Sequence, residues 1–314
     1  MISADWSRVS NDAFNAALFA YLAAMLGYFF HLAFRRESAW RAARLVAWTG
    51  LAGHVVSVVA RAIAAERVPW GNMYEYSSLL ALLVVAVYLV VLEGRYGLRA
   101  VGGFALAFSV LTMAVAVMFL YVGPAPLVPA LNSYWLKIHV VAAIVGSSLF
   151  AIGGGVLTLL YLVKDSRERK LAGTPPPIAG GSVDLGEQPP HYVSGADEPA
   201  ATRSSAKGIL PPAEVLDRLA YRTIAFAFPI WTFAVIAGAI WAERAWARYW
   251  GWDPKETWSF VTWTIYAGYL HARATAGWRG RKAAVIALVG FVSLLVTYYV
   301  VNLWIVGLHS YAGV

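Results

Sequence analysis

The 314-residue chain is 60% hydrophobic and 13% charged, whereas an average soluble domain is about 45–50% apolar and about 25% charged. Its mean hydropathy of +0.61 excludes an ordinary soluble protein built around one buried core. The chain has no cysteine, so it forms no disulfide and supplies no thiolate. Its net charge of +8 does not indicate a nucleic-acid partner. In a membrane protein the positions of the basic residues along the chain indicate its orientation in the membrane.

Eight long apolar runs predict an all-α fold, a polytopic membrane helical bundle with about eight transmembrane helices. The first run lacks a basic flank and a cleavage site, so we expect a permanent span there and not a signal peptide. The expected spans are 13–34, 44–65, 77–92, 100–122, 136–163, 223–242, 257–275 and 283–307.

Basic residues are concentrated in alternate connections between these spans. Connections 35–44, 93–99, 164–222 and 273–282 hold 18 of the 25 Lys and Arg residues, and the rest of the chain holds seven. The positive-inside rule then predicts that these connections face the cytoplasm and that both termini are extracytoplasmic. We expect a multi-pass protein of the cell inner or plasma membrane, or of the thylakoid membrane in a photosynthetic source.

A long polar segment divides the chain into two expected bundles. Residues 1–163 are predicted to form an N-terminal bundle of five spans, and residues 223–314 a C-terminal bundle of three. Residues 164–222 are predicted to be a cytoplasmic linker, largely disordered, because much of the segment is rich in Pro, Gly, Ser and Ala. Within it, residues 213–222 have helical apolar spacing and are expected to lie on the inner membrane face.

The loop 241–258, between the sixth and seventh spans, contains five tryptophans. One interpretation is an aromatic belt at the membrane interface. A belt does not require the compact string Trp250-Gly-Trp-Asp-Pro254, in which Gly251 permits close approach, the proline stiffens the turn and Asp253 caps the next helix. We therefore expect a flat aromatic platform for a large planar ligand, with charged side chains at its polar edge.

Two histidines are expected at the same membrane level as this loop. His139 begins the fifth span on the outer side, and His309 follows the outer end of the eighth. The iron of a porphyrin takes axial ligands from imidazoles on opposite faces, so the two residues suit a haem site on the outer side. The alternative is that each histidine only binds headgroups or water.

Two further histidines, His54 and His271, are expected inside spans. Both are predicted to lie roughly 17 to 21 Å deep, at about 1.5 Å of rise per residue. An imidazole within the membrane is costly and indicates a bundle interior or a functional site. Equal depth makes a pair possible, and for His54 a hydrogen bond between helices is the alternative.

These segments together resemble the CcsA family, also called ResC and in some bacteria CcsB, of System II cytochrome c biogenesis. The resemblance covers most of the chain. Its tryptophan-rich "WWD" signature has Ala247 where the fuller family pattern has Gly. The matching strings are Trp250-Gly-Trp-Asp-Pro-Lys-Glu-Thr-Trp258, Asn72-Met-Tyr-Glu75, Lys137-Ile-His139-Val and Gly307-Leu-His-Ser-Tyr311.

The resemblance implies a membrane haem-handling subunit of a holocytochrome c synthase. Such a subunit carries or captures haem b at the outer face and presents it for covalent attachment to apocytochrome c, so it is a holder with no certain catalytic residue. His139 and His309 would be the external axial ligands and His271 the transmembrane ligand, while His54 is a weaker candidate of our own. The remaining cofactor-binding candidates are Trp250, Trp252 and Trp258 as the platform, with Asp253 and Glu256 fixing its geometry.

The implied partners are a ResB-type membrane protein, apocytochrome c with its Cys-x-x-Cys-His motif and, indirectly, the thiol-reducing proteins of the pathway. No nucleic acid is expected. Two alternatives remain open. One is a System I haem export or lyase component, such as the shorter CcmC or the much larger CcmF. The other is a secondary transporter of an apolar solute, for which we find no inverted repeat.

Overall fold

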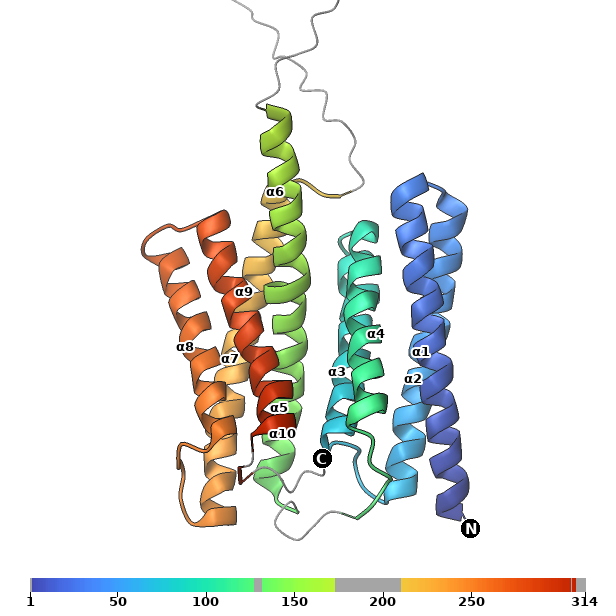
Figure 1. Ribbon diagram of the computed structural model, residues 1–314, viewed down its shortest axis with the longest axis vertical. Coiled ribbons are helices and arrows are strands. Elements are labelled where there is room, and N and C mark those ends of the chain that lie inside the picture. Colours follow the sequence, from blue (N-terminus) through green and yellow to red (C-terminus); the bar gives the residue numbers. More distant parts are fainter. Residues whose placement is uncertain (1, 127–131, 173–209, 306, 309–314) are drawn as a thin grey trace, which may run out of the picture.

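The computed structural model describes residues 2–126, 132–172, 210–305 and 307–308, and this described part is helical without strands. The helices stand side by side as one upright bundle (Figure 1). They are α1 (Ile2–Phe34), α2 (Glu37–Ala65), α3 (Met73–Val87), α4 (Gly102–Phe119), α5 (Tyr134–Phe150), α6 (Thr158–Ala172), α7 (Ala213–Trp246), α8 (Pro254–Ala274), α9 (Arg281–Leu295) and α10 (Val301–Trp304). Between them lie the π-helical segments η1 (Tyr88–Glu93), η4 (Ala151–Leu157) and η5 (Val296–Val300), and the 3-10 turn η2 (Arg99–Val101).

Within the described residues, seven helical stretches are long and apolar enough to cross a membrane. The predicted polytopic all-α bundle is therefore confirmed. The expected span at 257–275 is not among the seven, although α8 forms there. Its 21 residues extend about 31 Å at ~1.5 Å per residue, and it lies between α7 and α9 in contact with both. Polar residues on α8 lower its hydropathy without changing its place in the bundle.

Successive membrane-spanning stretches run in opposite directions, with α5–η4–α6 and α9–η5–α10 each forming one continuous stretch, so the connections gather at two ends of the bundle (Figure 1). One end holds the turns after α1, η1 and α8 and the facing ends of α6 and α7, which include the basic connections. The other end holds the start of α1, the turn after α2 and the tryptophan loop between α7 and α8. The connections rich in Lys and Arg therefore lie at one end of the bundle, as expected from the positive-inside rule. Which end faces the cytoplasm stays a prediction.

The expected linker is shorter at both edges than the sequence suggests. Helix α6 extends to Ala172 and α7 begins at Ala213. Residues 213–222, expected as a separate helix on the membrane surface, instead form the first turns of α7, because their apolar spacing continues into the span. Residues 173–209 lie outside the described residues.

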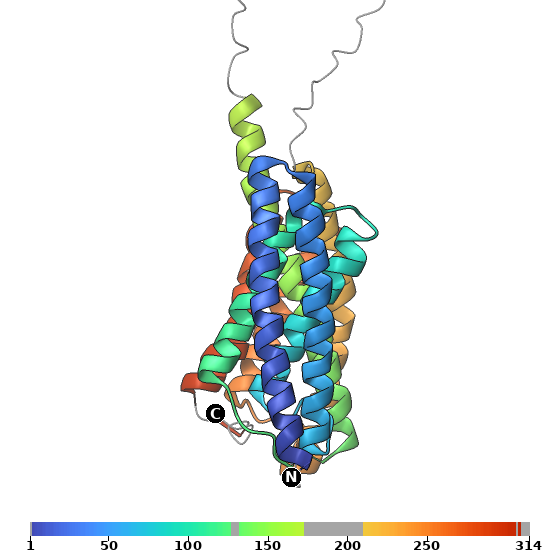
Figure 2. The same ribbon diagram turned by 90° about the vertical axis from the view of Figure 1, so that its right-hand side faces the viewer.

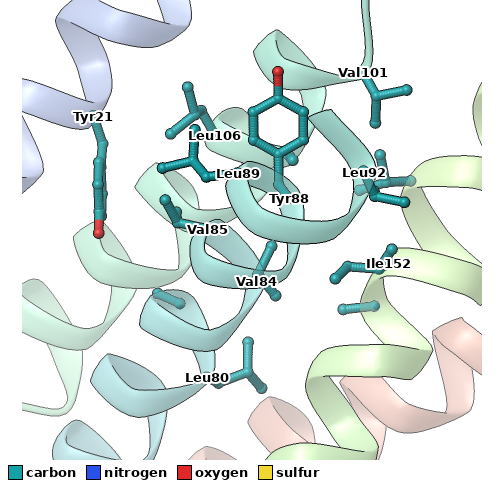
Figure 3. Packing of buried hydrophobic residues seen from close by; sticks show 14 of the residues in the cluster. Tyr21, Leu80, Val84, Val85, Tyr88, Leu89, Leu92, Val101, Leu106 and Ile152 are labelled. Atoms are coloured by element: carbon teal, nitrogen blue, oxygen red, sulfur yellow. The ribbon is translucent and has the colours of Figure 1, made fainter. Parts of the chain in front are cut away.

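The packing of the bundle centres on η4, which touches both halves. Ile152 of η4 belongs to the same hydrophobic cluster as Val84 of α3 and Leu92 of η1 (Figure 3), a cluster that also includes residues of α6 and α7. Phe150, directly before η4, stacks on Tyr266 of α8, with ring centroids 3.9 Å apart. The hairpin of α1 and α2 crosses the whole height of the bundle (Figure 2).

Three consecutive glycines in η4 allow this close packing, as small residues do between membrane helices. A Cβ at Gly154 would lie 2.2 Å from the Tyr266 hydroxyl oxygen and 3.2 Å from the Ala287 carbonyl oxygen. Tyr266 is fully buried and held by its stacking on Phe150, so it has no room to move away. The contact of α8 and α9 with the centre of the bundle therefore depends on Gly154.

We expect Gly154→Ala to lower the thermal midpoint of the detergent-solubilised protein, since overpacking costs about 1–3 kcal/mol. Gly268→Ala is the matched control, because Gly268 lies on the exposed side of α8 with no neighbour within 4 Å of an added Cβ. The control is expected to be neutral or to stabilise the helix by up to about 1 kcal/mol. Equal midpoints for the two variants would contradict this account of η4.

Candidate functional site

A large pocket opens at the end of the bundle that carries the tryptophan loop. It encloses about 1170 Å³ of empty space, part of it open to solvent, compared with about 300–1,000 Å³ for typical cofactor sites. Its walls come from α3, α5, α7, the start of α8 and the segment η5–α10. The aromatic residues that line it are Trp70, Tyr76, Trp231, Trp241, Tyr249, Trp250 and Tyr298.

His139 is half-buried in the wall that α5 and α7 form together. Its Nδ1 lies 2.7 Å from the backbone carbonyl oxygen of Ala234 on α7. A carbonyl oxygen only accepts, so Nδ1 carries the hydrogen and the neutral ring has its lone pair on Nε2. Histidines that ligate metals are commonly oriented by such a bond to a carbonyl.

Gly238 makes the position of this imidazole possible. A Cβ at Gly238 would lie 2.7 Å from Nδ1 and 2.8 Å from Cε1 of His139. The ring therefore occupies the space that any larger residue on α7 would fill. The sequence placed His139 at the level of the tryptophan loop, and the structure brings it into one pocket with Trp250 of that loop.

The start of α8 is fixed by a reciprocal cap. The Asp253 side chain accepts a hydrogen bond from the Lys255 amide at 3.3 Å, and Glu256 accepts from the amides of Gly251 and Asp253 at 2.8 and 3.2 Å. This is a capping box, so the prediction that Asp253 caps the helix is confirmed. The two carboxylates, buried at 7 and 8% exposure, hold the loop in one shape.

The three tryptophans of the expected platform do not form a flat surface. The rings of Trp250 and Trp252 are perpendicular, with centroids 5.7 Å apart. Trp252 has a left-handed backbone with φ of 57°, which turns its ring out of line, and its side chain is 65% exposed. Of Trp250, Trp252 and Trp258, Trp250 lines the pocket. The expectation of a flat platform was wrong, and the pocket walls supply the aromatic surface instead.

The end of the chain is attached to the same cap. The Leu308 amide donates to Asp253 Oδ1 at 2.6 Å. A Cβ at Gly307 would lie 2.6 Å from that oxygen, so glycine is required for this approach. His309 lies outside the described residues, and Leu308 is its neighbour in the chain.

His54 and His271 do not come together. His54 is fully buried in α2, with Nε2 2.9 Å from the Ser78 hydroxyl and Nδ1 3.4 Å from the Tyr21 hydroxyl. His271 is exposed on the last turn of α8, and α2 and α8 stand on opposite sides of the bundle (Figure 1). The pair that equal depth made possible does not form, because equal depth does not determine lateral position, and the alternative of a hydrogen bond between helices holds for His54. Since α8 begins at Pro254, His271 lies about 26 Å along it at ~1.5 Å per residue, near the end of α8 that is remote from the tryptophan loop.

Sequence reasoning missed two residues of the pocket, Tyr298 and Asn302. Both line it from the last expected span, where polar groups in an apolar run were the available signal. The Tyr298 hydroxyl is buried and has no partner among the described residues. Lys255 also lines the pocket. The sequence analysis included it in the tryptophan-rich string but gave it no role of its own.

The Asn72–Glu75 motif builds another wall of the pocket. Asn72 caps α3 by accepting from the Glu75 amide at 2.9 Å. The Glu75 carboxylate, 1% exposed, accepts from Arg61 Nε at 3.0 Å, from Arg67 Nη1 at 2.7 Å and from the Gly71 amide at 2.8 Å. It thereby fixes the segment that places Trp70 and Asn72 in the pocket lining.

Comparisons with known proteins agree with this architecture. The sequence model of the family described as "Cytochrome C assembly protein" matches residues 70–309. Similar relatives are the cytochrome c biogenesis proteins CcsA of Gloeobacter violaceus, 37% identical over 95% of this chain and 94% of the relative, and of Porphyra purpurea, 32% identical over 96% and 97%. The solved structure of cytochrome c heme lyase CcmF superposes with a TM-score of 0.66 at 15% identity, over 94% of this chain but 46% of CcmF.

The fold defines a multi-pass helical membrane protein with a large pocket at one end of its bundle. The chain belongs to the cytochrome c assembly protein family and, within it, to the CcsA proteins of cytochrome c biogenesis. The family expected from the sequence is thus confirmed, and the transporter alternative is not favoured. The similarity to CcmF, at 15% sequence identity, shows a shared fold alone.

We expect Glu75→Gln to destabilise the protein by about 3–5 kcal/mol, because it leaves two arginines in the buried cluster without their counter-charge. The matched control is Glu37→Gln, since Glu37 pairs with Arg99 at an exposed position, where a salt bridge contributes about 0–1 kcal/mol. Thermal midpoints of both variants in detergent test this. A loss at Glu75 no larger than at Glu37 would refute the role of the cluster.

Proposed function

We propose that this chain is the haem-handling subunit of a System II cytochrome c synthase, and that it holds haem b in the pocket beside the tryptophan loop. Its relatives are named as cytochrome c biogenesis proteins and its structural neighbour as a heme lyase. The observation that carries the proposal is the orientation of His139. Its Nδ1 hydrogen is committed to the Ala234 carbonyl oxygen, within a pocket that seven Trp and Tyr residues help to line.

This environment suits an iron porphyrin in two ways. A neutral imidazole with Nδ1 protonated offers Nε2 to the iron, and a carbonyl partner keeps the ring in that tautomer. Indole and phenol rings bury large apolar surfaces and stack on planar groups. Trp241, 2% exposed, and Trp250 supply such surfaces in the lining.

The anchored chain end supports His309 as the second external ligand. Leu308 is bonded to Asp253, and the next Cα along a trans peptide is about 3.8 Å away. The Asp253 cap is continuous with the loop that carries Trp250. Two imidazoles on one iron would protect it from other chemistry and tune its potential.

In this proposal the chain orients the reaction and the thiols come from elsewhere. The chain has no cysteine, so the two thiols of an apocytochrome Cys-x-x-Cys-His motif add across the haem vinyl groups, each forming a carbon–sulfur bond while its hydrogen goes to the other vinyl carbon. Holding the porphyrin beside the incoming motif makes these additions effectively intramolecular. The site would face the extracytoplasmic side, as the positive-inside rule predicts.

His271 fits a ligand that is completed by another protein. Its exposed position on α8 leaves room for a partner helix against that face of the bundle. We propose a ResB-type membrane protein as this partner, with apocytochrome c as the substrate. His54, whose ring nitrogens both lie within reach of hydroxyl groups, is better explained as a link between helices.

We expect the protein purified from haem-sufficient cells to show the absorption bands of bis-histidine haem. In His139→Ala these bands are expected to be lost and to return when imidazole is added, because imidazole refills the vacated ligand position. His54→Gln is the control and is expected to retain the bands, since His54 lies outside the pocket. A colourless wild-type protein, or a His139 variant with unchanged bands, would overturn the proposal.

We also expect Gly238→Ala to lower haem affinity about 10- to 100-fold, the usual effect of disturbing the group that orients a metal ligand. The added methyl group would displace the His139 ring from the Ala234 carbonyl oxygen. Gly146→Ala is the control on the same helix pair, because its Cβ would lie at an ordinary 3.4 Å from Trp231. Equal haem titration curves for the two variants would refute the proposed role of Gly238.

A further inference from the structure

Lys255 is the second residue of α8 and precedes the expected span 257–275. Its side chain is half-buried and lines the pocket. Among the described residues that line the pocket, it is the only lysine or arginine, and Glu256 is the only acidic residue. Oε2 of Glu256 accepts hydrogen bonds from the amides of Gly251 and Asp253, so this side chain stabilises the tryptophan loop. Lys255 therefore supplies the positive charge of the pocket.

The Lys255 ammonium makes no ion pair with a described residue. Burial lowers the pKa of Lys255 to about 8, and the charge of Asp253 acts in the opposite direction. An ammonium without a close partner in a partly desolvated site is destabilising until an anion binds it. The Tyr298 hydroxyl is buried and also lacks a partner among the described residues, and Tyr298 lines the same pocket. Glu256 Oε1 is a buried acceptor without a partner in the same lining, but no ion pair joins it to Lys255, so the ammonium remains available to an anionic ligand.

We propose that Lys255 binds a carboxylate of the ligand, namely a propionate group of the porphyrin. This inference rests on the proposed function and adds how the ligand is oriented. The porphyrin of haem b combines an apolar macrocycle with two carboxylates on one edge, which matches aromatic walls with one ammonium. Holding the carboxylate edge at Lys255 fixes the orientation of the macrocycle in the pocket. It turns the edge that carries the vinyl groups toward the open side. Lys255 is thus a positioning residue for the ligand.

The test compares haem with haem dimethyl ester, in which both carboxylates are blocked. Each ligand is titrated into the full-length haem-free protein in detergent, and binding is followed by the Soret band. We expect the wild-type protein to prefer haem by about 10- to 100-fold, the range for hydrogen bonds to charged groups. Lys255→Gln is expected to reduce this preference to near one, while Lys255→Arg retains most of it because the positive charge remains.

A second measurement separates binding from a structural role. Since Lys255 has no close partner in the empty pocket, the thermal midpoint of haem-free Lys255→Gln is expected to equal or exceed that of the wild type. Arg244→Gln, which removes the same charge from an exposed position on α7 at the same end of the bundle, is expected to leave both the midpoint and the preference unchanged.

The outcomes distinguish the two proposals. If Lys255→Gln binds haem with the wild-type preference over the ester, the role of Lys255 is refuted while haem binding in the pocket stands. If its midpoint falls and both ligands weaken equally, Lys255 is structural and the inference is also overturned. If wild-type protein binds neither ligand, the proposed function itself fails.

Discussion

The contact between α5 and α7 at His139 is the interaction on which the rest of the site depends. Gly238 brings the imidazole against α7, and the Ala234 carbonyl oxygen then takes the Nδ1 hydrogen at 2.7 Å. In the low dielectric of a helical bundle such a bond is strong and its loss is costly. One close helix contact therefore determines the position and the tautomer of the ring, and it leaves Nε2 as the nitrogen that would bind the iron in the proposed site.

Asp253 joins the tryptophan loop and the start of α8 to Leu308, 55 residues further along the chain. Its carboxylate caps α8, accepts from the amide of Leu308, and belongs to the capping box with Glu256 that shapes the tryptophan loop. Both carboxylates are buried, and backbone amides bond the side chain of Asp253 and Oε2 of Glu256, the kind of partner that buried polar groups require. The same principle holds across the pocket, where Glu75 gathers two arginines and the Gly71 amide. Buried carboxylates thus hold the loops in place, whereas the contact between α5 and α7 holds His139 in place.

The bundle was predictable from the sequence because the bilayer leaves few alternatives to apolar helices of spanning length. Polar side chains on α8 placed it below the hydropathy of a span, yet its neighbours hold it in the bundle. Depth along a helix was also predictable, but lateral position was not, so the sequence left open a pair of His54 and His271 that the structure excludes. The perpendicular rings of Trp250 and Trp252 follow from a left-handed residue that no composition reveals. Tyr298 was missed because its role arises from a pocket formed by five separate segments.

The location of the pocket follows from the same physics as the fold. Non-helical backbone is excluded from the lipid-exposed core of a membrane, so the loops that carry Asn72, Trp250 and Leu308 have to gather at the ends of the helices. There they bring capped helix starts, whose amides favour negative charge, beside an aromatic wall. An acidic, planar ligand meets the apolar wall, the imidazole and the ammonium of Lys255 in one place. In the described part of the central bundle, apolar clusters and close contacts such as that at Gly154 pack the helices together. A site at the end of the bundle therefore follows from the packing that makes its centre dense.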